Sequence, residues 1–197
     1  MLSQATSWPH ISTGDLLRKH IAAGSQAGLA SQQILHGEYA PDEVVNQLVA
    51  ERMAGQDCRN GVVLDGYPRT LEQIRLFLPA LEAVRMAPIV VRLKVDYNEI
   101  SRRLEFRRNC SFCGAIYNTE TLPPQAEGIC DVCGHSLVAR PDDRSEVIAK
   151  RLGHYAALTT PVETLLREKM GGRWIELNGA AQPADLLNSL LGKIRKN

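Results

Sequence analysis

Val62–Thr70, which reads Val-Val-Leu-Asp-Gly-Tyr-Pro-Arg-Thr, is the stretch that decides the fold. Its apolar, β-branched start is typical of a strand buried on both faces of a parallel sheet. Asp65 follows at the carboxyl end of that strand, where ligands bind in open α/β sheets and where a carboxylate can hold hydrated magnesium. Arg69 offers a planar fork that suits phosphate. Taken alone, however, a strand end, a turn and a solvated arginine explain the stretch better.

Thr70 and Gln73 have the spacing of a capping box at the start of the next helix. Gln73 therefore has two interpretations. It either caps this helix, or it hydrogen-bonds the edge of a base, because its amide is both a donor and an acceptor.

A similar pattern lies upstream, where the short extended segment 10–12 leads into a helix with Ser12 and Asp15 at capping-box spacing. Arg18 follows about one turn later, within reach of an anion held at the positive end of the helix. A normal cap with an exposed arginine is the plainer alternative. Further helices are expected over 27–36 and from Pro41, which makes a small helical lobe between two strands.

Downstream, a strand over 89–95 precedes a helix that begins after Asp96. We expect this helix to carry four arginines, with Arg103 and Arg107 on one face because they are four residues apart. Such a cluster indicates either an anionic ligand or a solvated helix face.

The strongest chemical signal is a pair of CxxC motifs, Cys110–Cys113 and Cys130–Cys133, which sixteen residues separate. This spacing predicts a zinc site with four cysteine ligands, closed and therefore structural. His135 is a weaker candidate ligand than the four thiolates, and Cys58 is expected to be an ordinary small residue.

Beyond the cysteines, a helix carrying Arg151 is expected to end near Leu158, and Thr160-Pro161 is expected to start another. A strand over 174–177 and a final helix from Pro183 complete the pattern.

Composition limits the function classes. With a net charge of +1, the chain has no strong overall positive charge that would favour binding to nucleic acid or an anionic membrane. No apolar run is long enough to span a bilayer. The N-terminal residues lack the features of a signal peptide, so we expect a cytoplasmic protein whose five cysteines are thiols or metal ligands.

Five features together resemble the adenylate kinase family in its long form, which has a zinc-binding lid: Ile-Ser-Thr-Gly-Asp-Leu-Leu-Arg (11–18), Leu-Asp-Gly-Tyr-Pro-Arg-Thr-x-x-Gln (64–73), the arginine segment, the cysteine insert and Arg-Pro-Asp-Asp (140–143). The resemblance implies an α/β, P-loop NTPase-like parallel sheet flanked by helices. It implies one domain, 1–197, containing a monophosphate-binding lobe at 12–41 and a zinc-binding lid at 106–143. The implied activity is reversible phosphoryl transfer from ATP to AMP, giving two ADP.

The resemblance also implies site residues. The expected AMP site comprises Thr13, Arg18, Glu38, Tyr39, Ala40, Gly66, Tyr67, Pro68, Arg69, Gln73, Arg140 and Arg151. The expected ATP site comprises Arg103, Arg107, Ile116, Tyr117, Gly179 and Ala181. The expected catalytic residues are Asp65, Arg69, Arg107, Arg140 and Arg151, with Mg²⁺ held near Asp65 together with ATP. Structural Zn²⁺ is expected on Cys110, Cys113, Cys130 and Cys133.

One departure is that the chain contains no G-x-x-x-x-G-K-[ST] phosphate loop. In the family, the strand before that loop lies between those expected near Val62 and Ile89. A misassigned start codon and a truly truncated product both explain this, and we expect the chain to be weakly stable and inactive as it stands.

The alternative function is a catalytically inactive nucleotide-binding pseudo-kinase or a gene fragment. A zinc ribbon that binds nucleic acid is disfavoured, because the insert has almost no basic residues between its cysteines. ATP, AMP and ADP are the expected partners, with neither nucleic acid nor membrane, and a complete chain is expected to be monomeric.

Overall fold

The computed structural model describes residues 1–194. The α-helices are α1 (Leu2–Thr6), α2 (Thr13–Ala22), α3 (Gln26–Leu29), α4 (Asp42–Met53), α5 (Leu71–Ala83), α6 (Tyr97–Glu105), α7 (Ser145–His154), α8 (Thr160–Met170) and α9 (Pro183–Ile194). The strands are β1 (His10–Ser12), β2 (Val63–Asp65), β3 (Val90–Lys94), β4 (Arg107–Cys110), β5 (Ile116–Asn118), β6 (Leu137–Val138) and β7 (Trp174–Asn178). Short 3₁₀ turns are η1 (Gln32–His36), η2 (Gln56–Cys58), η3 (Pro141–Asp143) and η5 (Gly171–Arg173). Residues 195–197 of the predicted domain lie outside this description.

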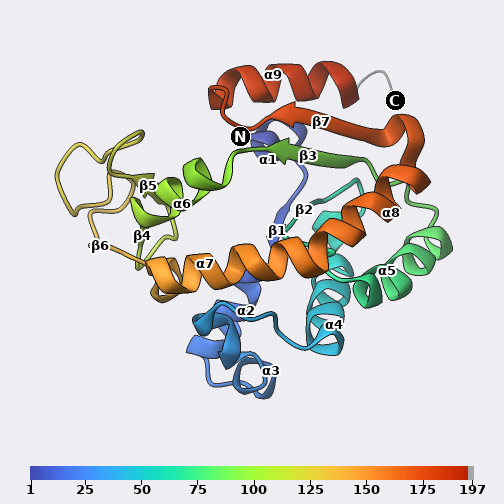
Figure 1. The fold of residues 1–197 in the computed structure, drawn as a ribbon, viewed down its shortest axis with the longest axis horizontal. Coiled ribbons are helices and arrows are strands. Elements are labelled where there is room, and N and C mark those ends of the chain that lie inside the picture. The colour runs from blue at the N-terminus through green and yellow to red at the C-terminus, as the bar shows by residue number, and fades with distance from the viewer. Residues whose placement is uncertain (195–197) are drawn as a thin grey trace.

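The strands form two parallel pairs and one small antiparallel sheet, which confirms the predicted α/β class with parallel strands (Figure 1). β1 pairs with β2, with Ile11 opposite Leu64, and β3 pairs with β7, with Val91 opposite Ile175. β4 lies between β5 and β6 in the antiparallel sheet.

The expectation that β2 is buried on both faces is wrong. Val63 and Leu64 are only half-buried, and Asp65 is exposed. Within residues 1–194, β2 has a single hydrogen-bonded neighbour, β1, so its other edge is not covered by a strand. The strand predicted over 89–95 is present but shorter, at Val90–Lys94.

Three apolar clusters hold these elements together. The first cluster lies in the helical lobe, between α2 and α4. The second lies between α5 and α8. The third lies between α9 and β7. Their buried members are Leu17, Ala40, Val45, Leu48 and Val49; Ile74, Val162, Leu166 and Met170; and Ile175, Leu177 and Leu190.

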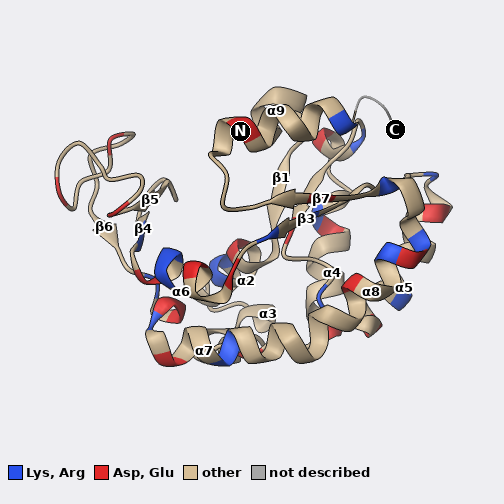
Figure 2. Ribbon diagram, turned by 45° about the horizontal axis from the view of Figure 1, so that its top comes forward, with Lys and Arg blue, Asp and Glu red and all other residues tan. Residues whose placement is uncertain are grey.

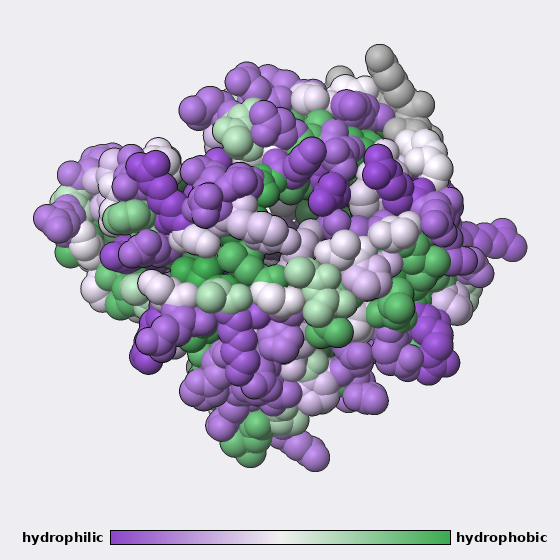
Figure 3. All heavy atoms as spheres, viewed as in Figure 1, coloured by the Kyte–Doolittle hydropathy of each residue, from purple (hydrophilic) through white to green (hydrophobic). Residues whose placement is uncertain are grey.

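A long helical rod crosses the molecule below the strands in Figure 1. It begins as α7, widens into a π-helical turn over Tyr155–Thr159, and continues as α8. The predicted helix start at Thr160-Pro161 is confirmed as the start of α8, but no loop separates it from the helical turn before it. Pro161 has no N–H to give to the preceding turn, and the wider turn accommodates it without ending the helix. In the space-filling view, a mostly apolar band follows this rod across the middle of the molecule (Figure 3).

The lobe also differs from its prediction, because the helix expected over 27–36 is split into α3 and the 3₁₀ turn η1. Across residues 1–194, the structure contains no helix with the length and apolar character needed to cross a membrane.

Candidate functional site

A cavity lies where the helical lobe, the end of β2 and the start of α7 meet. Twelve predicted site residues line it: Thr13, Arg18, Glu38, Tyr39, Ala40, Asp65, Gly66, Arg69, Gln73, Arg107, Arg140 and Arg151. Sequence reasoning did not assign seven further lining residues: Ser12, Gly14, Leu17, Ile34, Gly37, Val45 and Asp142.

The N-terminus of α2 forms one wall of the cavity. The Ser12 hydroxyl accepts a hydrogen bond from the Asp15 amide at 3.3 Å, which confirms the predicted cap. Buried Thr13 donates its hydroxyl to the carbonyl of Gly66 at 3.0 Å and so ties α2 to the turn after β2. Gly66 has φ +74°, a left-handed conformation that side-chain-bearing residues rarely adopt, so this turn favours glycine.

Gln73 fixes the backbone of that turn. It is 2% exposed, its Oε1 accepts from the Arg69 amide at 2.7 Å, and its Nε2 donates to Asp42 at 2.8 Å. The helix itself is capped by Thr70, whose hydroxyl accepts from the Gln73 amide at 3.1 Å. The side chain of Gln73 therefore orients Arg69 while it borders the cavity.

Two buried aspartates hold arginines that come from three different elements. Asp143 binds Arg107 through two hydrogen bonds of 2.8 and 2.6 Å. Arg151 lies 3.3 Å from Asp143 and 3.5 Å from Asp142, and Arg18 lies 3.3 Å from Asp142. Sequence reasoning missed the role of these two acids, although their position directly after Arg140-Pro141 was a signal.

The cavity is rich in positive charge. Burial, followed by the neighbouring Arg107 and Arg18, lowers the pKa of Arg140. Burial also lowers the pKa of Arg151, against the opposing influence of the two aspartates. Because burial is the largest cause of both shifts, keeping these guanidiniums charged is costly here, and a bound anion would offset that cost. Figure 2 shows blue and red segments close together around α2, α6 and the start of α7, with further charged segments along α5 and α9.

Asp65 lies at the rim of this cavity. Its side chain is 63% exposed, and one carboxylate oxygen is 3.4 Å from Nε2 of His10. Such an accessible oxygen is chemically suited to hold magnesium through water.

Tyr67 and Pro68 were predicted at the AMP site but are not among the lining residues. The Tyr67 hydroxyl donates to Asn46 at 2.6 Å, and its ring packs edge-on against Phe77. Burial, followed by the charge of Asp42, raises the pKa of Tyr67. The phenol of Tyr67 therefore binds Asn46 of α4 and does not line the cavity.

The predicted ATP-site residues do not all lie together. Arg103 is bound to Glu99 at 2.6 Å and donates to the Gly179 carbonyl at 2.9 Å, which brings two of them together near Ala181. Arg107 reaches the cavity instead. It does not share a helical face with Arg103 as expected, because α6 ends at Glu105 and Arg107 begins β4.

Ile116 and Tyr117, both in β5, have opposite surroundings. Ile116 is 53% exposed, whereas Tyr117 is 7% exposed and lies within the cluster of cysteines. The Tyr117 hydroxyl is 3.5 Å from Sγ of Cys130 and accepts from the Asp131 amide at 2.8 Å.

The four predicted cysteine ligands converge. Their sulfur atoms all lie within 4.8 Å of one another, with 3.4 Å between Cys110 and Cys133 and 3.6 Å between Cys113 and Cys130. A tetrahedral zinc–thiolate site places its sulfurs about 3.8 Å apart, given Zn–S bonds of about 2.3 Å. The cluster therefore fits a zinc ion. Cys58 lies apart, buried beside Arg52.

Comparison with known proteins gives consistent matches. A family model described as adenylate kinase matches residues 1–170. The adenylate kinase of Thermosipho africanus is 38% identical over 190 residues, which cover 95% of this chain and 88% of the relative. That of Pseudothermotoga lettingae is 43% identical over 163 residues, covering 82% of this chain and 75% of the relative. That of Thermosipho melanesiensis is 37% identical over 197 residues, which cover 99% of this chain and 91% of the relative.

Proposed function

The chain belongs to the adenylate kinase family, and on that premise we propose that its arginine-lined cavity receives AMP as the acceptor of the phosphoryl group. The family transfers phosphoryl groups between adenine nucleotides, and this chain is a kinase of that family. The observation that carries the assignment is the convergence of Arg18, Arg69, Arg107, Arg140 and Arg151 on one cavity.

On the AMP side, Arg69 and Arg18 bind the phosphate, because a guanidinium forms paired, charge-assisted bonds to phosphate oxygens. The lobe supplies Thr13 and the stretch 38–40, and the turn after β2 supplies the stretch 66–68. Gln73 contributes the remaining amide proton of its Nε2 to the base edge. Support comes from their common position around the cavity, apart from Tyr67 and Pro68.

For the transfer itself, Arg107, Arg140 and Arg151 neutralise the charge that develops on the equatorial oxygens of the moving group. Phosphoryl transfer depends mainly on such positioning and electrostatic stabilisation. Asp142 and Asp143 hold two of these arginines in place before the substrate arrives, which lowers the cost of reorganisation.

On the ATP side, we assign Arg103, Arg107, Ile116, Tyr117, Gly179 and Ala181. The bond between Arg103 and the Gly179 carbonyl supports one part of this set. Asp65 would hold Mg²⁺ that arrives with ATP, and the ion would neutralise phosphate charge there.

The lobe over 12–41 is the monophosphate-binding part and the segment 106–143 is the lid, within one domain over 1–197. Cys110, Cys113, Cys130 and Cys133 would hold a structural Zn²⁺, which replaces the apolar core that so short an insert lacks. We further propose a cytoplasmic protein, monomeric when the chain is complete, that binds ATP, AMP and ADP but neither nucleic acid nor membrane, in keeping with its net charge of +1.

The test is coupled ADP formation from ATP with AMP, GMP, CMP or UMP as acceptor, measured beside calorimetric binding of each acceptor. The proposal predicts that calorimetry gives the tightest binding for AMP, and that any phosphoryl transfer measured prefers AMP as the acceptor. AMP binding without ADP formation would favour the pseudo-kinase alternative. Preference for another monophosphate would contradict the acceptor assignment.

A further inference from the structure

Tyr39 lies where three separate parts of the chain meet: the end of the lobe, the turn that carries Arg69, and the π-helical turn. Its ring centroid is 5.4 Å from Cζ of Arg69, and its hydroxyl is 2.9 Å from Oγ1 of Thr159. Its carbonyl accepts from Nε2 of Gln33 at 3.1 Å, which fixes the backbone on the lobe side.

The hydrogen bonds around Thr159 run in one direction. Thr159 is buried, and its single hydroxyl proton goes to the carbonyl of Arg69 at 3.1 Å. Tyr39 must therefore donate to Thr159. The result is a continuous chain from the Tyr39 phenol through Thr159 to the backbone of Arg69.

Tyr39 thus contacts Arg69 at two points. The ring lies within the distance at which an aromatic face attracts a guanidinium, and the phenol reaches the Arg69 carbonyl through Thr159. Two further polar groups of Arg69 are also held, since its amide binds Gln73 and its Nε donates to the Gly66 carbonyl at 2.9 Å. A long, flexible side chain is in this way confined to one orientation.

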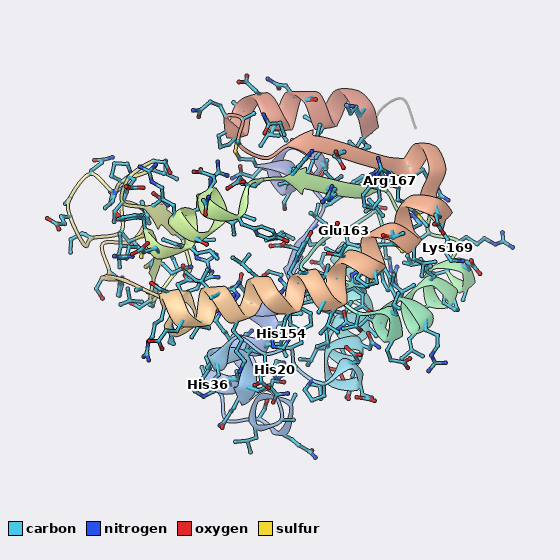
Figure 4. All side chains as sticks on the ribbon, viewed as in Figure 1. His20, His36, His154, Glu163, Arg167 and Lys169 are labelled. Atoms are coloured by element: carbon cyan, nitrogen blue, oxygen red, sulfur yellow. The ribbon has the colours of Figure 1, made fainter. Side chains whose placement is uncertain are left out.

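The core side of this contact is packed as well. His154, at the end of α7, lies on the side of the rod that faces the lobe (Figure 4), with its ring centroid 5.8 Å from that of Tyr39. One residue earlier in the lobe, Glu38 pairs with Lys150 of α7 at 2.7 Å. The lobe and the rod are therefore in contact at two successive residues, Glu38 and Tyr39.

We propose that Tyr39 is a positioning residue that orients the Arg69 guanidinium for the phosphate of AMP, with Thr159 of the π-helical turn as its anchor. The inference rests on the proposed function, in which Arg69 binds that phosphate. It leaves the backbone of 38–40 at the AMP site but gives the Tyr39 side chain a role other than contact with the nucleotide, because its ring lies against Arg69 and its phenol is bonded to Thr159.

The test is a double-mutant cycle on AMP affinity, measured by calorimetry. Tyr39→Leu removes both contacts and should weaken AMP binding about 5–10-fold. Tyr39→Phe keeps the ring, loses the donor and should weaken it about threefold, and Thr159→Val should cost at least as much. In an Arg69→Ala background, Tyr39→Leu should change the affinity by less than about twofold, because the residue it positions is gone.

Adenosine provides the matched ligand and Tyr97→Phe the matched protein control, since Tyr97 is 51% exposed at the start of α6. Adenosine affinity should be insensitive to all Tyr39 variants, and Tyr97→Phe should bind AMP normally. If Tyr39→Leu does not fold, the comparison of Tyr39→Phe with Thr159→Val still decides the matter.

The outcomes separate the two claims. No effect of Arg69→Ala on AMP binding would overturn the proposed function itself. A clear effect of Arg69→Ala with no effect of Tyr39 or Thr159 variants would overturn the positioning role alone. Additive losses in the cycle, or equal losses for adenosine, would show direct contact between Tyr39 and the nucleotide and would also overturn it.

Discussion

Arg107 and Asp143 are joined by two hydrogen bonds of 2.8 and 2.6 Å, although they lie on opposite sides of the cysteine-bearing insert in the sequence. The Asp143 side chain is 2% exposed and that of Arg107 is 18% exposed. The pair fastens both ends of the cysteine-bearing insert beside the cavity, so it acts on the fold and on the site together.

Replacing Asp143 should strongly destabilise the folded protein. Asp143→Ala leaves Arg107 without its buried partner, and breaking such a pair costs about 3–5 kcal/mol of unfolding free energy. Urea denaturation measures this. Glu72→Ala is the matched control, because it breaks an exposed pair with Arg75 and should change stability little. Similar losses for both variants would contradict the account of the buried pair.

The cysteine cluster should bind one zinc per chain. Protein produced in zinc-supplemented medium should contain one equivalent by metal analysis, and Cys130→Ser combined with Cys133→Ser should lose it. Cys58→Ser, which alters a cysteine outside the cluster, should retain it. Less than half an equivalent in the unaltered protein would be inconsistent with a structural zinc site.

Tyr117 should tune that zinc affinity, because its hydroxyl is 3.5 Å from Sγ of Cys130. Losing such an outer-shell partner typically weakens metal binding about 10–100-fold. Tyr117→Phe should therefore release zinc to a competing chromogenic chelator at lower chelator concentration, whereas Tyr97→Phe should not. Identical competition curves for the two variants would refute this role.

Arg69 should contribute a charge-assisted bond to the phosphate of AMP. Arg69→Ala should weaken AMP binding by about 1.5–3 kcal/mol, which calorimetry measures directly. Arg69→Lys keeps the charge but loses the planar fork, so its AMP affinity should fall between that of the unaltered protein and that of Arg69→Ala. An unchanged affinity for Arg69→Ala would remove this residue from the site.

Local signals in the sequence predicted part of the structure well. Ser12 and Thr70 cap their helices as their spacing indicates, and the two CxxC motifs converge. These features depend on neighbouring residues or on a pattern with one common chemical cause, so a linear pattern is enough to predict them.

Features that depend on distant contacts were predicted less well. Arg107 continues a helical pattern from Arg103, but pairing of β4 with β5 places it opposite Asn118 and ends the helix. Likewise, Pro161 lies in the first turn of α8 as predicted, but nothing in the sequence indicated the π-helical turn that joins α7 to α8 without a loop. The buried role of Asp143 also depends on an arginine 36 positions away.

The central claim is that the cavity recognises a nucleoside monophosphate through its phosphate, and the most direct measurement is calorimetric titration of the protein with AMP and with adenosine. The account predicts saturable binding of one AMP per chain and adenosine binding weaker by at least about tenfold, because charge-assisted bonds to the phosphate are lost. Equal affinity for the two ligands, or no saturable binding of AMP, would contradict it.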